Sequence, residues 1–185
     1  MADEGSKLRI ITVGRLHPRK GQDRILDALG NLPSDLKETV EYILVGPETN
    51  PRYTRRLREK SNRVGLPVQF LGDLQPSELR KVYAGADVFA LTSTYQKGSV
   101  EGFGFVYLEA ASHGLPAIAH RIGGVEDAVV HDETGLLVAH DKPKELGEAM
   151  ERMLRDAELR ARMGQSAQVR AAKFNWEQPA LDLYG

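Results

Sequence analysis

The sequence contains no cysteine, which excludes disulfide bonds and thiolate metal sites and fits a reducing compartment. It also lacks an excess of charge of either sign, since 25 Lys and Arg residues stand against 26 Asp and Glu, for a formal net charge of -1. So small a net charge creates no global field to hold nucleic acid or an anionic membrane. Any anion site must therefore be local, and we expect no nucleic-acid partner.

Signals for export or membrane insertion are missing as well. The first residues, MADEGSKLRI, carry neither the basic lead nor the apolar run of a signal peptide, and residues 1–7 are expected to be a disordered or tag-like start. No apolar stretch approaches the ~20 residues of a membrane-spanning helix. We therefore expect a cytoplasmic protein. The basic stretch RYTRRLREKSNR, residues 52–63, leaves a peripheral membrane contact open, although on an exposed helix it is more often a solvated face.

What the sequence does contain is a regular alternation of short apolar runs with segments of helical period. Its 185 residues and its hydrophobic fraction of 41% suffice for one domain with a buried core. The runs are mostly continuous and rich in Val and Ile, as strands buried on both faces should be. They are residues 8–14, 40–46, 67–71, 87–93, 116–120 and 134–138.

The alternation predicts the fold class. Strand and helix repeat five times, which is typical of a parallel sheet covered on both sides. We expect an α/β fold: a single Rossmann-like, doubly wound domain with about six parallel strands flanked by helices. Residues 142–173 predict a helical, polar-rich region, and Phe174 and Trp176, the only Trp, are candidates to anchor the end of the chain.

The loop after the first strand contains two cations that suit a phosphate. In open α/β sheets ligands lie at the carboxyl ends of the strands. Gly14 ends the strand, Arg15 and Lys20 follow, and we expect a helix to begin near Lys20. Arg offers a planar fork and Lys a compact charge for phosphate oxygens, but both can equally be ordinary solvated loop residues. The segment is not a Walker loop, because it has no Gly directly before Lys20 and no Ser or Thr after it.

The segment SVEGFGFVYLEA, residues 99–110, places two acids around a pair of glycines. Glu101 fits best in a loop, with a helix beginning around Gly104 or Phe105. Gly102 and Gly104 let bare backbone amides approach a ligand at the helix N-terminus, where the dipole also favours an anion. The segment does not complete the dinucleotide-binding fingerprint, because Tyr107 stands where the third Gly belongs.

Glu109 lies further along this helix among apolar neighbours, so its carboxylate needs a partner or a cleft. With a helical rise across the interval, Glu101 and Glu109 are roughly 10–12 Å apart, about the length of a diphosphate with a sugar on either side. One acid can then accept from a transferred sugar and the other from ribose hydroxyls. The simpler alternatives are a dipole-favoured acid at the helix start and a solvent-facing glutamate.

Three segments together carry a resemblance to a known family. EGFGFVYLE, VGRLHPRKG and ASHGLPAIAHRIGGVEDAVVHDETGLLV resemble the donor-binding, C-terminal half of retaining glycosyltransferases of the GT-B fold, specifically family 4, whose mark is a Glu-x7-Glu motif. Each motif is weak alone, but the three occur in family order and spacing through nearly the whole chain. The GSVEGFG and GGVEDAV variants look closest to the mannosyltransferase-like branch. One departure is Glu126, which stands where the family commonly has Pro.

The resemblance implies roles for individual residues. Arg15 and Lys20 would bind the donor diphosphate beside Gly14, and Glu109 would take the ribose hydroxyls. Glu101 would meet the sugar and the distal phosphate, so that Glu101, Arg15 and Lys20 form the catalytic set. The backbone amides expected to share this work are those of Gly102, Phe103, Gly104 and Phe105. The base would lie against Gly46, Pro47, Gly72 and Leu74.

The residues also agree with a reaction that uses no metal and no cofactor. The sequence has no Asp-x-Asp pair, and its five His residues show no ligand spacing on any predicted helix. Charge on the leaving diphosphate would then be offset by cations and helix-end amides. The resemblance thus implies transfer from a GDP- or UDP-sugar, with a mannosyl donor among the candidates, in polysaccharide or glycolipid biosynthesis.

Enzymes of this family carry a second Rossmann-like domain, N-terminal to this one, that holds the acceptor. The chain begins with the first strand of the donor domain, so we expect an isolated, inactive C-terminal domain, either a fragment or half of a two-chain enzyme. Residues 8–173 would form the nucleotide-sugar-binding domain, and residues 174–185 a helical tail that crosses to the missing domain or packs on this one.

Two other functions remain open. The chain can be a non-catalytic module that binds a nucleotide sugar, or a nucleotide-sugar epimerase of related fold. An epimerase is expected to show a different acid pattern from Glu-x7-Glu.

Overall fold

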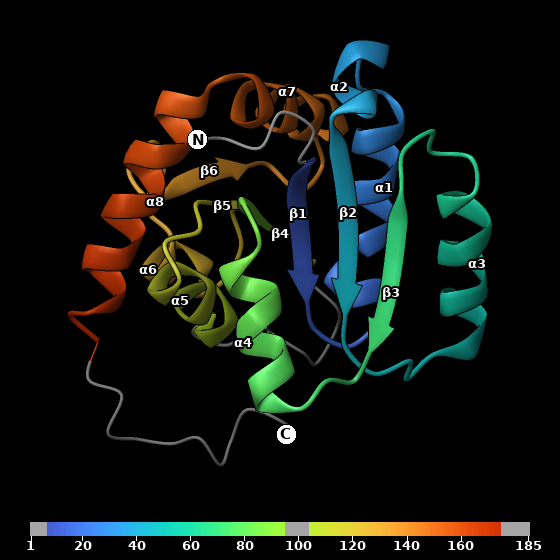
Figure 1. The fold of residues 1–185 in the computed structure, drawn as a ribbon, viewed down its shortest axis with the longest axis horizontal. Helices are drawn as coiled ribbons and strands as arrows, with labels where there is room; N and C mark the ends of the chain where they lie inside the picture. Colours follow the sequence, from blue (N-terminus) through green and yellow to red (C-terminus); the bar gives the residue numbers. More distant parts are fainter. Residues whose placement is uncertain (1–6, 95–103, 175–185) are drawn as a thin grey trace.

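The computed structural model describes residues 7–94 and 104–174. Six strands form a single sheet, in which all neighbouring strands run parallel (Figure 1). The strands are β1 (Leu8–Val13), β2 (Val40–Val45), β3 (Val68–Gly72), β4 (Val88–Leu91), β5 (Ala117–His120) and β6 (Gly135–Val138). All six strands that the sequence predicts are confirmed.

Helices connect these strands, as expected for parallel crossovers. They are α1 (Gln22–Gly30), α2 (Ser34–Glu38), α3 (Pro51–Ser61), α4 (Pro76–Ala84), α5 (Phe105–Ser112), α6 (Val125–Ala128), α7 (Pro143–Arg155) and α8 (Ala157–Ala171). Proline at the first turn of α3, α4 and α7 suits its missing N–H, because that donor has no partner within a helix there.

The strand order is β3-β2-β1-β4-β5-β6. The chain therefore winds outward from β1 in one direction and from β4 in the other, and the order reverses between these two strands. This arrangement confirms the predicted doubly wound fold, and it places a switch point at the carboxyl ends of β1 and β4, where such folds bind ligands. The arrowheads of β1, β2 and β3 mark the same edge in Figure 1.

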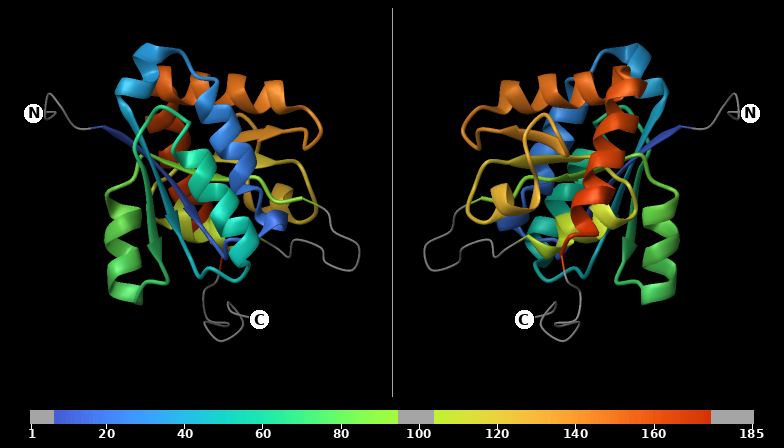
Figure 2. Two further views of the ribbon diagram at one scale, coloured as in Figure 1. Left: turned by 90° about the vertical axis from the view of Figure 1, so that its right-hand side faces the viewer. Right: turned by 90° about the vertical axis from the view of Figure 1, so that its left-hand side faces the viewer.

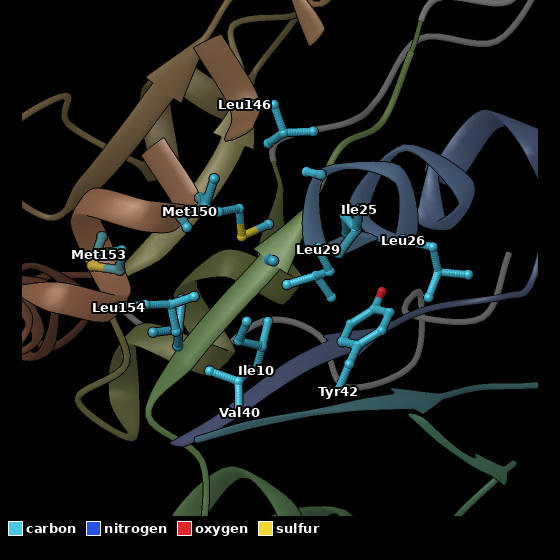
Figure 3. Close-up of a cluster of buried hydrophobic side chains, with 14 of the residues drawn as sticks. Ile10, Ile25, Leu26, Leu29, Val40, Tyr42, Leu146, Met150, Met153 and Leu154 are labelled. Carbon is cyan, nitrogen blue, oxygen red and sulfur yellow. The ribbon is translucent and has the colours of Figure 1, made fainter. Parts of the chain in front are cut away.

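Both faces of the sheet are buried except at the edge strand β3, because alternate residues of the other strands enter separate clusters. Ile10 belongs to the cluster under α1, α3 and α7, whereas Ile11 belongs to the cluster under α4, α5 and α6. Figure 2 shows α4 on one side of the sheet and α1 and α3 on the other. Figure 3 shows the first cluster, in which Leu29 of α1 and Met150 of α7 lie above the strands. Burial on two faces explains why the strands read as continuous apolar runs.

Two helix boundaries differ from the simplest reading of the sequence. The helix expected near Lys20 begins at Gln22, because Pro18–Lys20 forms a short 3-10 turn and Gly21 then adopts a left-handed conformation with φ 69. The helical region at residues 142–173 is two helices that break at Asp156, whose Oδ1 accepts from the Leu159 amide at 2.8 Å and caps α8.

The last helix is fixed tightly to the domain. Gly164 of α8 lies so close to the turn after α5 that a Cβ there would be 2.2 Å from the Gly114 carbonyl oxygen. Phe174 packs against the second cluster with the Arg170 guanidinium 5.5 Å from its ring centre, which confirms a contact of this residue with the same domain. Trp176 and the rest of the predicted tail lie outside the described residues. No helix in the described part of the chain is long and apolar enough to cross a membrane.

Candidate active site

Three glycines end adjacent strands and leave backbone at the carboxyl edge of the sheet. The Gly14 amide donates to the Val45 carbonyl at 2.8 Å, and the Gly46 amide donates to the Gly72 carbonyl at 2.7 Å. A Cβ on Gly46 would lie 2.2 Å from the Gly14 carbonyl oxygen, so β1 and β2 can approach this closely only with glycine there. The predicted positions Gly14, Gly46 and Gly72 therefore lie side by side.

The two predicted phosphate cations also lie at this edge. Arg15 is exposed, and its guanidinium makes no hydrogen bond or ion pair with residues in the ranges 7–94 and 104–174. The aliphatic chain of Lys20 passes beside Gly14, with Cε 3.9 Å from the position of a Cβ on that glycine. A guanidinium without an acidic partner, next to a lysine, can receive an anionic ligand.

The loop that carries these cations is clamped to the end of β4. The Thr92 hydroxyl donates to the Gly21 carbonyl at 2.7 Å, and the Thr94 amide donates to the Arg19 carbonyl at 2.8 Å. A Cβ on Gly21 would lie 2.1 Å from the Thr92 carbonyl oxygen, so the contact requires glycine. Lys20 is thus fixed directly above the switch point between β1 and β4.

Gln22 supports the same loop from below, and no sequence motif identified it. Its side chain is fully buried, and its Nε2 donates to the Arg15 carbonyl at 2.9 Å. The Tyr53 hydroxyl of α3 lies 3.3 Å from Gln22 Oε1 and 2.8 Å from Asp23 Oδ1. Burial raises the pKa of Tyr53, so that its hydroxyl remains a donor. The sequence feature that could have pointed to Gln22 is its place directly after Lys20 and Gly21.

The predicted base-binding residues follow β2 and β3. The Pro47 carbonyl accepts from the Leu16 amide at 3.0 Å, which ties the loop after β2 to the loop after β1. Gly72 has φ 67, and a Cβ there would meet no atom within 4 Å, so the space above it is open. Leu74 is partly buried in the second cluster. Open space over a glycine beside an apolar side chain is compatible with a flat ring.

The helix of the Glu-x7-Glu segment begins at Phe105, as predicted, with Gly104 as its N-cap at φ 76. Phe105, the first residue of this helix, is 47% exposed. Glu101, Gly102 and Phe103 lie outside the described residues. The part of the predicted clamp that the structure describes is therefore Gly104, Phe105 and Glu109.

Glu109 is partly buried and has a partner, as its apolar neighbours predict. The Tyr83 hydroxyl of α4 donates to Glu109 Oε2 at 3.2 Å, and the Tyr83 ring stacks on His113 with centroids 5.0 Å apart. Burial raises the pKa of Glu109, while the Tyr83 hydrogen bond and nearby His113 oppose the rise. The simple alternative of a fully solvated glutamate is excluded by this geometry.

A buried histidine lies beneath the crevice, on β5. His120 is 2% exposed, and its Nδ1 lies 3.0 Å from the Ser93 carbonyl. Because a carbonyl only accepts, Nδ1 carries the proton and donates. Burial lowers the pKa of His120 to about 4, so the ring is neutral at pH 7. The Ser93 hydroxyl is buried without a hydrogen-bond partner among the described residues. Ser93 comes shortly after the end of β4, and His120 is the last residue of β5.

A family model described as Glycosyl transferases group 1 matches residues 2–170. The chain belongs to this family. It is 37% identical over 175 residues to D-inositol 3-phosphate glycosyltransferase of Corynebacterium glutamicum (strain R), a match that covers 92% of this chain and 41% of that protein. It is 35% identical over 166 residues to a GDP-mannose-dependent monoacylated alpha-(1-6)-phosphatidylinositol monomannoside mannosyltransferase of Corynebacterium glutamicum, covering 88% of this chain and 42% of that protein.

Solved structures agree with the family. The crystal structure of Anabaena Alr3699/HepE in complex with UDP and glucose matches with a TM-score of 0.79 and 30% identity, over 90% of this chain and 44% of that one. The C-terminal domain of LpcC, a glycosyl transferase group 1 family protein from Francisella tularensis, shares the fold with a TM-score of 0.77 at 24% identity, over 90% of this chain and 85% of that one. The chain thus spans about two fifths of the length of the two curated relatives named above.

Within residues 7–94 and 104–174, no three His, Asp or Glu side chains are placed to hold a metal ion. The groups that the structure brings to the crevice are instead Arg15, Lys20 and backbone amides.

Proposed function

We propose that the chain is the donor-binding domain of a retaining, metal-independent glycosyltransferase. The observation that carries the proposal is the placement of Arg15, which has no partner among the described residues, and of Lys20, whose aliphatic chain passes beside Gly14, at the carboxyl end of β1 where the strand order reverses. This arrangement can hold a diphosphate and stabilise the charge that develops on it as the glycosidic bond breaks. Family membership supports a sugar donor, since the family is one of glycosyl transferases.

The donor is proposed to be a GDP- or UDP-sugar. One relative is named for its dependence on GDP-mannose, and the similar Anabaena protein was crystallised with UDP and glucose. These two proteins support guanine and uracil as candidate bases, and the first of them supports a mannosyl donor. The open space above Gly72 and the apolar Leu74 offer a place for the base.

Each predicted residue has a proposed role in donor binding. Arg15 and Lys20 contact the diphosphate, and Glu109 accepts from the ribose hydroxyls. Glu101, with the backbone amides of residues 102–105, meets the sugar and the distal phosphate. Gly104 and Phe105 begin α5, where the positive end of the helix dipole favours an anion.

The acceptor is proposed to bind to a second, N-terminal domain that completes the cleft. The share of each relative that the chain covers, 41% and 42%, supports a larger enzyme in which this domain is one part. The chain on its own would then bind nucleotide weakly and transfer no sugar. A cytoplasmic enzyme that touches the membrane surface is consistent with a relative named for a phosphatidylinositol substrate.

The proposal predicts that the 185-residue chain binds UDP or GDP, and that Arg15→Ala or Lys20→Ala weakens binding at least about tenfold, because a charge-assisted hydrogen bond contributes about 1.5–3 kcal/mol. Isothermal titration calorimetry with UDP, GDP and ADP at millimolar concentration measures this. Arg55→Ala is the matched control, since Arg55 is also exposed and makes no hydrogen bond or ion pair with the described part of the chain, but lies on α3. Absence of a heat of binding with both UDP and GDP would contradict the proposal, and ADP tests the selectivity for the base.

A further inference from the structure

A fully buried amide connects α3 to the backbone of the proposed phosphate loop. Gln22 is the first residue of α1, and it has no exposed surface. A buried amide that lacked partners would be costly, so both its ends need hydrogen bonds. Its Nε2 donates to the Arg15 carbonyl at 2.9 Å, and its Oε1 lies 3.3 Å from the Tyr53 hydroxyl.

The hydrogen bond from Gln22 lies at the start of the loop, on the residue that carries the proposed phosphate-binding guanidinium. Thr92 and Thr94 hold the far end of the loop from Arg15 to Gly21. Beside Arg15, the Leu16 amide donates a hydrogen bond to the Pro47 carbonyl. The Gln22 amide is the side chain that bonds to Arg15 itself. Because the guanidinium of Arg15 makes no ion pair with the described residues, the direction of its side chain depends on its backbone.

Tyr53 in turn fixes Gln22. Its hydroxyl accepts from the Asp23 amide at 3.1 Å and lies 2.8 Å from Asp23 Oδ1, so it is anchored to the first turn of α1 from two sides. Asp23 also pairs with Arg56 of α3. The chain of contacts therefore runs from α3 through Tyr53 and Gln22 to the Arg15 carbonyl.

We infer that Gln22, held by Tyr53, is a positioning residue that orients Arg15 toward the diphosphate of the donor. The inference rests on the proposed function, because it assigns a role in the same site. Gln22 does not touch the ligand. It restricts the backbone that carries the cation, so that less conformational freedom is lost when the diphosphate binds.

The test is a double-mutant cycle between Gln22→Met and Arg15→Ala, measured by calorimetry with UDP and uridine, or with GDP and guanosine if the chain binds the guanine nucleotide. Methionine has a similar length and removes both the donor to the Arg15 carbonyl and the Oε1 acceptor, which shares the single Tyr53 hydroxyl proton with Asp23. We expect Gln22→Met to weaken diphosphate binding about fivefold, as loss of a hydrogen bond of about 1 kcal/mol would, and to leave nucleoside binding unchanged. In the Arg15→Ala background it should cause no further loss, because the two residues act through one contact.

Two further variants separate positioning from stability. Tyr53→Phe removes only the supporting hydroxyl and should weaken diphosphate binding in the same direction but less, which keeps the test available if Gln22→Met unfolds. Tyr42→Phe is the control, since its buried hydroxyl bonds Thr12 at 2.7 Å and makes no contact with Arg15. It should lower stability and leave the ratio of nucleoside to diphosphate affinities unchanged.

The outcomes distinguish the two proposals. Additive effects of Gln22→Met and Arg15→Ala, or equal loss of nucleoside and diphosphate binding, would overturn the positioning role and leave donor binding intact. If the unsubstituted chain binds neither UDP nor GDP, the proposed function fails first, and the role of Gln22 fails with it.

Discussion

Glu109 is a single residue that destabilises the fold and has a proposed role in binding. Its carboxylate is partly buried on an apolar helix, and burial raises its pKa. A carboxyl whose pKa is higher in the folded state binds more protons there, so the free energy of unfolding falls as pH rises through the titration of this group. The ionised form at neutral pH therefore destabilises the fold, which is typical of residues kept for function.

Glu109→Gln is consequently expected to move stability and binding in opposite directions. Gln retains the shape and an oxygen that can accept from Tyr83, so the melting temperature at pH 7 should rise. Affinity for nucleoside diphosphate should fall about tenfold or more, because a charged acceptor of ribose hydroxyls contributes about 1.5–3 kcal/mol. Thermal unfolding and calorimetry on the same samples measure both quantities.

Glu126→Gln serves as the comparison, because Glu126 is an exposed acid paired with Arg121 at 2.7 Å. It should change neither property by much, since exposed ion pairs contribute little. A Glu109→Gln variant with unchanged nucleotide affinity would remove this residue from the proposed site.

At the scale of elements, two helical glycines have opposite environments. A Cβ at Gly164 of α8 would lie 2.2 Å from the Gly114 carbonyl oxygen, whereas a Cβ at Gly147 of α7 would meet no atom within 4 Å. Gly164→Ala should lower the free energy of unfolding by about 1–3 kcal/mol, because α8 must move away from the turn after α5. Gly147→Ala should raise it by up to about 1 kcal/mol through helix propensity.

Urea unfolding of the two variants measures this difference. The pair controls for the substitution itself, since both replace glycine by alanine inside a helix. Equal effects at the two positions would mean that α8 does not pack as closely as the structure shows.

The elements were largely predictable from the sequence because burial on both faces of a parallel strand leaves a continuous apolar run. β1 and β5 are examples, with near-complete burial of their central residues. The start of α1 was less predictable, because the 3-10 turn at Pro18–Lys20 depends on a contact between Gly21 and Thr92, which lie 71 residues apart.

The sequence predicted those site residues that belong to a recognisable motif. It did not predict residues whose importance depends on a tertiary contact. The glycines and cations could be located from their place after strands. Gln22, Tyr83 and His120 could not, because their importance arises from partners on other elements: Arg15, Glu109 and Ser93. Hydrogen bonds between distant side chains leave no periodic pattern in a sequence.

At the scale of the whole molecule, acid stability should depend on His120. Its pKa is lowered from 6.5 to about 4 in the folded state, so the unfolded chain binds a proton in this window while the folded chain does not. The free energy of unfolding therefore decreases as pH falls from 6.5 to about 4, by on the order of 3 kcal/mol for a shift of this size. Protonated Glu109 acts in the opposite direction at the lower end of this range.

His120→Asn should reduce the decrease in the free energy of unfolding between pH 7 and 4. Its amide can still donate to the Ser93 carbonyl, but it does not titrate. Urea unfolding between pH 7 and 4 compares the slopes of the two proteins. A variant that keeps the full slope of the unsubstituted chain would show that other groups dominate.

The clamp between Gly21 and Thr92 also has a consequence for the order of folding. β1, β2 and β3 belong to the first half of the chain, but the phosphate loop that follows β1 is held by the end of β4, which pairs with β5 on its other side, and β5 in turn pairs with β6. A folding intermediate with only the first three strands paired would contain Arg15 and Lys20 without their fixed positions. Affinity for diphosphate should therefore appear only after the two halves of the sheet have joined at β1 and β4, which makes nucleotide binding a kinetic probe of that late step.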